Sequence, residues 1–117
     1  MIAKEIASIM ESMKAKDIVL LDVGEKIKIT DYFLIASGSN RRMLQAIAHE
    51  IEKGLKQTFG LRPRIEGLQI GWWILMDYGD VVVHLFQDEA RSYYDLENLW
   101  ADAPRVDWKM PDKDRAI

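Results

Sequence analysis

The sequence has no cysteine and only two histidines among its 117 residues. Without thiols, a disulfide scaffold, a thiolate zinc site and a cysteine nucleophile are all excluded. His49 and His84 alone cannot form a three-histidine metal centre within one chain, and we expect neither a metal site nor a cofactor. Residues 1–16 carry a charge every few positions, which suits neither a signal peptide nor a membrane span. We therefore expect a cytoplasmic protein that makes no membrane contact.

Negative charge is concentrated in one segment of the chain. The net charge of the whole sequence is only −3. Residues 77–100, however, contain a single basic residue, Arg91, and six acids: Asp77, Asp80, Asp88, Glu89, Asp95 and Glu97. Because surfaces that bind nucleic acids are usually basic, this segment favours a basic partner and argues against direct, sequence-specific binding of nucleic acid. On charge alone, a solvated acidic helix is the simpler explanation.

Apolar periodicity and turn residues predict an α/β protein with one domain. Helical spacing of apolar residues is found in 2–15 and in a segment that follows the cap-forming residues 37–40 and ends near residue 58. Strand-like runs occupy 17–23, 32–36, 64–66, 72–77 and 80–86, and a last helix is expected at 88–100. This order predicts a mixed β-sheet packed with helices over residues 1–100. Residues 101–117 are polar and are expected to form a flexible tail.

The hairpin at residues 72–86 is the most informative segment. If Tyr78-Gly79 is a two-residue loop, one strand face carries the pairs Asp77–Asp80, Leu75–Val82 and Trp73–His84. The other face is wholly apolar and suits the core: Trp72, Ile74, Met76, Val81, Val83 and Leu85. An apolar centre with an aromatic anchor and an acidic edge is typical of a protein-binding patch. The alternative, Trp73 under a helix and His84 in the interior, is equally consistent with these residues.

An enzyme is the second class of function that the sequence raises. Gly38-Ser39 lies between an apolar strand and a helix, where backbone N–H groups can hold a phosphate, and Arg41 and Arg42 follow. Nucleotidyl transfer also needs two carboxylates one residue apart on a strand to hold Mg²⁺, and the sequence has no such pair. A helix cap with solvated arginines is the simpler interpretation. A serine hydrolase is disfavoured because no Gly-x-Ser-x-Gly motif is present.

Several motifs in order resemble the ribosomal silencing factor family, also called Iojap-like proteins. The resemblance covers residues 2–100. Its carriers are KDIV and LDV within 16–23, TDYFLIASGS at 30–39, EG at 66–67, WILMDYGDVVVHLF at 73–86, RxxY at 91–94 and DLENLW at 95–100. A match of several motifs at the right spacing is more specific than any one of them.

The resemblance implies a fold related to nucleotidyltransferases without their catalytic acids, and a function that is not catalysis. Members of the family bind the large ribosomal subunit through ribosomal protein L-fourteen, which blocks joining of the small subunit and represses translation. Related organelle proteins act in large-subunit assembly, so an assembly factor is an alternative. The family's partner-facing surface includes a tryptophan and an aspartate that match Trp73 and Asp77.

We extend this surface to neighbours that share the face or the turn of the hairpin: Leu75, Tyr78, Asp80, Val82 and His84. Exposed apolar side chains there would also allow the free chain to form a homodimer.

Overall fold

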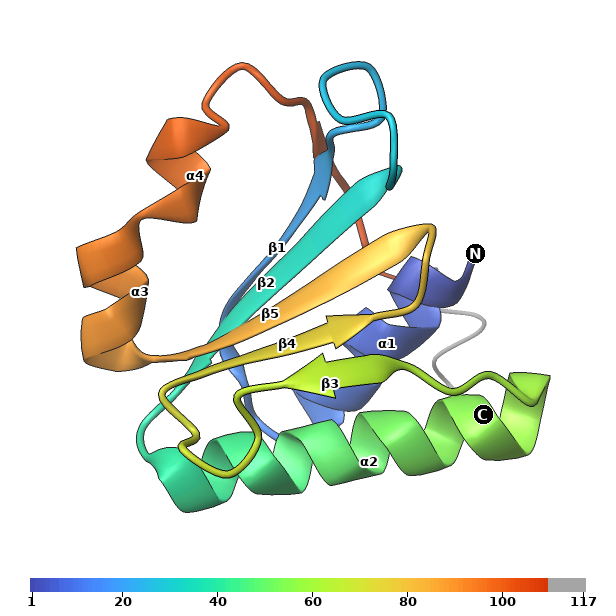
Figure 1. Cartoon of the computed structure of the whole chain (residues 1–117), viewed down its shortest axis with the longest axis vertical. Helices are drawn as coiled ribbons and strands as arrows, with labels where there is room; N and C mark the ends of the chain where they lie inside the picture. The colour runs from blue at the N-terminus through green and yellow to red at the C-terminus, as the bar shows by residue number, and fades with distance from the viewer. Residues whose placement is uncertain (110–117) are drawn as a thin grey trace.

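The computed structural model describes residues 1–109, and their centre is one mixed β-sheet (Figure 1). Within these residues the strand order is β3-β4-β5-β2-β1-β6, and only β2 and β5 run parallel. The strands are β1 (Lys16–Asp22), β2 (Tyr32–Gly38), β3 (Arg64–Glu66), β4 (Trp73–Asp77), β5 (Val81–Gln87) and β6 (Arg105–Val106). The predicted α/β class with a single mixed sheet is confirmed.

Two long helices cover one face of the sheet. They are α1 (Ile2–Ser12) and α2 (Arg41–Phe59), which lie side by side beneath the strands in Figure 1. In α2 every third or fourth residue is buried, which is the spacing of an amphipathic helix on a core. The main core lies between these helices and the sheet, and its largest side chains include Ile6, Met10, Leu34, Leu44, Ile47, Ile51, Ile74 and Met76. No helix within residues 1–109 is long and apolar enough to span a membrane.

The other face of the sheet is only partly covered. Two short helices, α3 (Asp88–Tyr94) and α4 (Leu96–Leu99), pack there over a smaller core that contains Phe33, Ile35, Phe86 and Ala90. They leave strand β4, the second strand of the sheet, with alternating exposure, in which Ile74 and Met76 are buried and the residues on either side of them are half-buried. This partly open strand face is where the hairpin surface was predicted.

The segment predicted as one helix, 88–100, is broken in two. Asp95 adopts a left-handed conformation with φ of 46°, which ends α3 before α4 begins. Arg91 then ties the pair of helices to the sheet. Its guanidinium donates hydrogen bonds to the Ser37 hydroxyl (2.7 Å), the Asp17 carbonyl (2.7 Å) and the Glu97 carboxylate (2.8 and 2.9 Å).

We expect Arg91→Ala to lower the free energy of unfolding by about 2 kcal/mol, because it removes charge-assisted hydrogen bonds and leaves the buried Ser37 hydroxyl without its donor. The measurement is the urea midpoint of the variant against the parent chain. The matched control is Lys16→Gln, which breaks the exposed Lys16–Asp88 ion pair (2.6 Å) and should change stability by less than about 0.5 kcal/mol. Equal midpoints for the two variants would contradict the role of Arg91.

The predicted flexible tail is wrong for its first nine residues, 101–109. Strand β6 pairs with Leu20 and Leu21 of β1, and Ala103 is buried. The Trp108 side chain packs against the main core, and its indole N–H donates to the Ile18 carbonyl at 3.0 Å. A two-residue strand has too little periodicity to be recognised in a sequence, and it forms because the edge of β1 is open. Residues 110–117 lie outside the described part of the chain.

Candidate interaction surface

The hairpin has a different register from the predicted one. Asp77 pairs with Val82 rather than with Asp80, and the Tyr78 N–H donates to the Val81 carbonyl at 2.9 Å, so the loop is centred on Gly79-Asp80 rather than on Tyr78-Gly79. The Asp77 carboxylate accepts a hydrogen bond from the Gly79 N–H (2.8 Å), and Gly79 has a φ of 89° that favours glycine. The Asp80 carbonyl accepts from two N–H groups at the start of β2, which holds the loop against the neighbouring strand. The register differs by two residues, so side-chain alternation is unchanged and the predicted strand face survives.

The structure brings four of the seven predicted surface residues together. Trp73, Leu75, Asp77 and Val82 are half-buried on the open face of β4 and β5. The other three lie elsewhere: His84 is buried beneath this face, Tyr78 packs against the main core on the opposite side of the sheet, and Asp80 is exposed at the hairpin tip. Tyr78 and His84 are therefore corrections to the predicted contact surface. Trp72, predicted for the main core, packs instead with the smaller one.

Trp73 is held by contacts on several sides. Its ring centroid lies 4.6 Å from that of Tyr94 on α3 and 4.9 Å from that of Phe86. Its indole N–H donates to Nδ1 of His84 at 3.1 Å. A Cβ on Gly67 would lie 2.2 Å from the Trp73 carbonyl oxygen, so only glycine allows the loop after β3 to approach this closely. The indole is therefore fixed in place while part of it remains accessible.

His84 supports Trp73 from below. It is 4% exposed, and burial lowers its pKa from 6.5 to about 4. Because Nδ1 accepts the indole hydrogen bond, the proton of the neutral ring is on Nε2, which is buried without a partner among the described residues. Phe33 packs edge-on against the imidazole at 4.7 Å. The sequence left two interpretations of this face open, a binding patch or an interior face. His84 fits the second, because it is an interior histidine, and Trp73 fits the first, because it is half-exposed.

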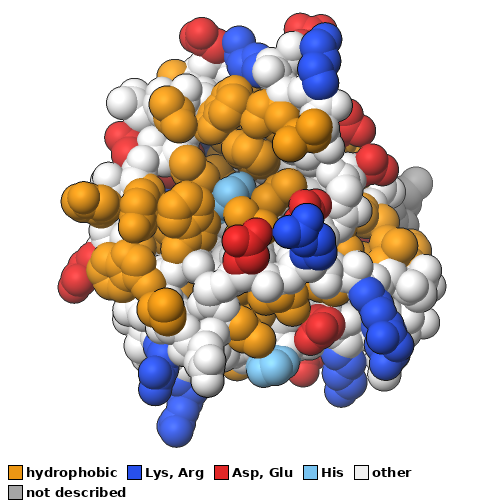
Figure 2. Space-filling model, viewed as in Figure 1, with side chains coloured by type: hydrophobic (Ala, Val, Ile, Leu, Met, Phe, Trp, Pro, Cys, Tyr) orange, Lys and Arg blue, Asp and Glu red, His pale blue; other side chains and the backbone are white. Residues whose placement is uncertain are grey.

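Further apolar side chains extend this surface onto α3. Tyr93 and Tyr94 are 79% and 40% exposed, and their rings meet edge to face at 5.0 Å. We call Trp73, Leu75, Val82, Tyr93 and Tyr94 the aromatic face. Figure 2 shows hydrophobic side chains gathered over α3, α4 and the neighbouring strands. A cavity of about 240 Å³, lined by Glu66, Gly67, Trp73 and Leu75, lies at its edge.

The two tyrosines were not identified from the sequence. The available signal was the Tyr-Tyr pair itself, because adjacent side chains on a helix point in different directions and a short helix with a narrow buried stripe exposes at least one of them.

Only half of the acids in residues 77–100 are available to a partner. Asp88 pairs with Lys16, Asp77 accepts the turn hydrogen bond, and Glu97 pairs with Arg91, whose hydrogen bond holds the pKa of Glu97 below its usual value. The remaining three are exposed and form no ion pair with any residue in 1–109: Asp80, Glu89 and Asp95.

The Gly38-Ser39 turn is closed by the chain's own atoms. The Ser39 N–H donates to the Met43 sulfur (3.4 Å), and the Asn40 side chain accepts from the Met43 N–H (2.9 Å) as the cap of α2. A Cβ on Gly71 would lie 2.2 Å from Cγ of Arg41, so the Arg41 side chain packs against the loop that follows β3. These contacts describe a capped helix start rather than an open phosphate cradle. Across residues 1–109 no three His, Asp or Glu side chains lie close enough to hold a metal ion.

The fold and this surface define a small mixed α/β domain that presents a fixed, partly exposed tryptophan on an open strand face. Residues 1–116 match the family described as "Ribosomal silencing factor during starvation". The chain is 43% identical to the ribosomal silencing factor of Halalkalibacterium halodurans over 84% of each protein, and 42% identical to that of Bacillus subtilis over 91% of this chain and 90% of the relative. The chain belongs to the ribosomal silencing factor family, as its motifs predicted.

Two further similarities extend these findings. A crystal structure of a Chromobacterium violaceum protein superposes with a TM-score of 0.82 at 32% identity, covering 94% of this chain and 91% of the other. A mouse protein named "Mitochondrial assembly of ribosomal large subunit protein 1" is 36% identical over 81% of this chain and 43% of its own length.

Proposed function

We propose that this protein binds the large ribosomal subunit through ribosomal protein L-fourteen and thereby blocks joining of the small subunit, which represses translation in the cytoplasm. The observation that carries the proposal is the half-exposed Trp73, fixed at the centre of the aromatic face. An immobilised tryptophan pays little conformational entropy on binding, and tryptophan is enriched among interface residues that dominate affinity.

Occlusion needs no catalytic group and no change of shape. A bound domain whose longest dimension is 38 Å has enough volume to prevent two subunits from meeting, provided that it occupies their shared face. Family membership supports the ribosome as the target. The accessible acids around the aromatic face fit a basic ribosomal protein, because complementary charge steers association.

The test is a sucrose gradient of purified protein with isolated large subunits, before and after small subunits are added. We expect the protein to sediment with large subunits and to reduce the peak of joined ribosomes. Protein that remains at the top of the gradient, with an unchanged joined peak, would refute the proposal.

The association rate should fall as ionic strength rises, because Asp80, Glu89 and Asp95 attract a basic partner over a distance that salt screens. We expect the triple variant Asp80→Asn, Glu89→Gln, Asp95→Asn to bind severalfold more slowly at low salt and to lose most of this dependence. Stopped-flow or surface-based kinetics at several salt concentrations measures both quantities. A rate that is indifferent to salt would rule out steering.

A role in large-subunit assembly is the second candidate, and the name of the mouse relative favours it. Subunit profiles of a deletion strain separate the two functions, because immature large-subunit precursors accumulate only if assembly is impaired.

A nucleotide-binding enzyme is the weaker alternative, since the Gly38-Ser39 turn is already capped. Thermal stabilisation by ATP and Mg²⁺ that is lost in Arg41→Ala, Arg42→Ala would favour it. The homodimer of the free chain stays a prediction, which sedimentation velocity checks.

A further inference from the structure

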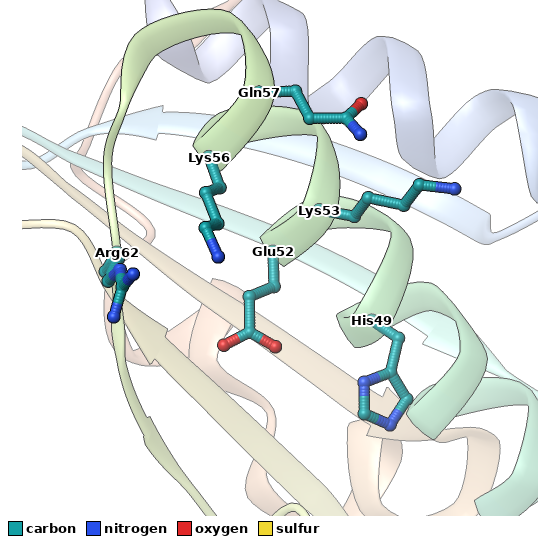
Figure 3. Close-up of a pocket in the computed structure, with 6 residues that line it drawn as sticks. All are labelled: His49, Glu52, Lys53, Lys56, Gln57 and Arg62. Carbon is teal, nitrogen blue, oxygen red and sulfur yellow. The ribbon is translucent and has the colours of Figure 1, made fainter.

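A second surface lies on the other side of the sheet from the aromatic face. The C-terminal half of α2 and the extended segment after it enclose an open cleft of about 730 Å³ (Figure 3). We call it the basic cleft. Its lining side chains are His49, Glu52, Lys53, Lys56, Gln57 and Arg62.

The end of α2 explains how the cleft forms. Gly60 is left-handed with a φ of 67°, its N–H donates to the Lys56 carbonyl at 3.0 Å, and the Leu61 N–H donates to the Leu55 carbonyl at 3.2 Å. This capping motif reverses the chain, and Pro63 prevents the helix from continuing. The chain therefore returns beside the helix, and Arg62 lies across the opening from Lys56 and Glu52, whereas Lys53 and Gln57 extend toward the other side of the helix (Figure 3).

Cations dominate this end of the molecule. Residues 53–65 contain Lys53, Lys56, Arg62 and Arg64 and no acid. The three that line the cleft are exposed and form no ion pair with any residue that the structure describes. A lysine in the last turn offsets the helix dipole, which accounts for Lys56 but not for the other two.

Glu52 is the one acid in the lining, and it sits deeper than the cations. It is half-buried, and its charge adds to burial in raising the pKa of Tyr78 to about 12. Its carboxylate therefore lies toward the sheet, where Tyr78 packs, while the ammonium and guanidinium groups reach solvent at the rim.

We propose that the basic cleft binds the phosphodiester backbone of structured RNA. The three rim cations can each approach a phosphate, and the only ring in the lining on which a base could stack is the imidazole of His49. Contacts to phosphates alone give affinity without sequence preference. The choice of RNA rests on the proposed ribosomal target, whereas the cleft shares no residue with the aromatic face. A large subunit engaged at both sides of the sheet would hold the protein by RNA as well as by protein.

The test is fluorescence anisotropy of a labelled RNA hairpin with the full chain in about 50 mM KCl, where phosphate contacts are strong. The cleft variant replaces its three cations with glutamine: Lys53→Gln, Lys56→Gln and Arg62→Gln. The matched control removes three exposed lysines elsewhere: Lys14→Gln, Lys26→Gln and Lys28→Gln. We expect the cleft variant to bind about tenfold or more weakly, with a log–log salt slope smaller by about 2, and the control to stay within about twofold of the parent chain.

Two further variants sharpen the result. Glu52→Gln removes the only acid in the cleft and should strengthen RNA binding, which loss of folding cannot imitate. Trp73→Ala should leave RNA binding unchanged, so failure of the proposed L-fourteen contact is seen separately, in the gradient with large subunits.

Three outcomes would overturn the proposal. The parent chain fails to bind the hairpin at low salt, or the cleft and control variants lose affinity equally, which indicates non-specific charge attraction. In the third, polyglutamate competes as well as unlabelled RNA at equal charge, which identifies an acidic peptide as the ligand.

Discussion

Replacing Trp73 with alanine is expected to weaken binding to the large subunit by about thirtyfold or more, equivalent to about 2 kcal/mol. The indole fills the centre of the aromatic face, where it contacts Tyr94 and Phe86 and has its N–H fixed by His84. Truncation removes the anchor and leaves a hollow beside Leu75 that the partner cannot fill. The measurement is the dissociation constant for large subunits at a temperature where the variant is folded.

The same substitution also removes packing, so a matched control is needed. Trp108→Ala truncates another half-buried indole that donates a single hydrogen bond, but this one packs on the opposite side of the sheet. We expect both variants to lose stability and only Trp73→Ala to lose affinity. Trp73→Phe should retain part of the affinity, because its ring can still contact Tyr94. Equal affinities of the Trp73→Ala and Trp108→Ala variants would show that the aromatic face is not the contact surface.

How far the sequence could predict this surface is clearest in the hairpin. Alternation of side chains across a strand depends only on the parity of the register, so Trp73, Leu75 and Asp77 were assigned to the correct face although every cross-strand pair was wrong. The position of the loop is coupled to hydrogen bonds from the Asp31 and Tyr32 N–H groups to the Asp80 carbonyl, and these donors are distant in sequence. The residue preferences of short turns carry no information about such long-range hydrogen bonds, so the turn could not be placed from the sequence.

The other errors have the same origin. Tyr78 was assigned to the loop, whereas it lies opposite Val81 and continues the alternation of Ile74 and Met76 toward the main core. The helix at 88–100 breaks at Asp95, where Arg91 and Glu97 draw the two halves onto the sheet. Strand β6 exists only because the open edge of β1 is available to it. Helices with a long apolar stripe, such as α2, were predicted closely because their signal is local and repeated.

The buried imidazole gives the second large effect, a loss of stability in mild acid. Burial lowers the pKa of His84 from 6.5 to about 4. Between pH 4 and pH 6.5 the imidazole is therefore protonated in the unfolded chain and neutral in the folded chain. The stabilisation is fully present above pH 6.5 and is lost as the pH falls toward 4, by about 3 kcal/mol in total. Protonation would also place an N–H at Nδ1, facing the indole N–H of Trp73, so the hydrogen bond that fixes the aromatic face would be broken.

Carboxylates elsewhere also titrate in this range, so the decisive quantity is the difference between the parent chain and His84→Phe. Phenylalanine cannot be protonated, keeps a ring beside Phe33 and Phe86, and removes the unpartnered Nε2. It also removes the Nδ1 acceptor of the Trp73 indole N–H, a loss that is the same at every pH above the pKa of His84. Free energies of unfolding from urea titrations between pH 7.5 and 4.5 should fall less steeply for this variant than for the parent chain. Parallel curves for His84→Phe and the parent would mean that His84 is protonated as readily in the folded chain as in the unfolded one. In that case the indole of Trp73 would not be held by a neutral imidazole, and the fixed position that makes it an interface anchor would need another cause.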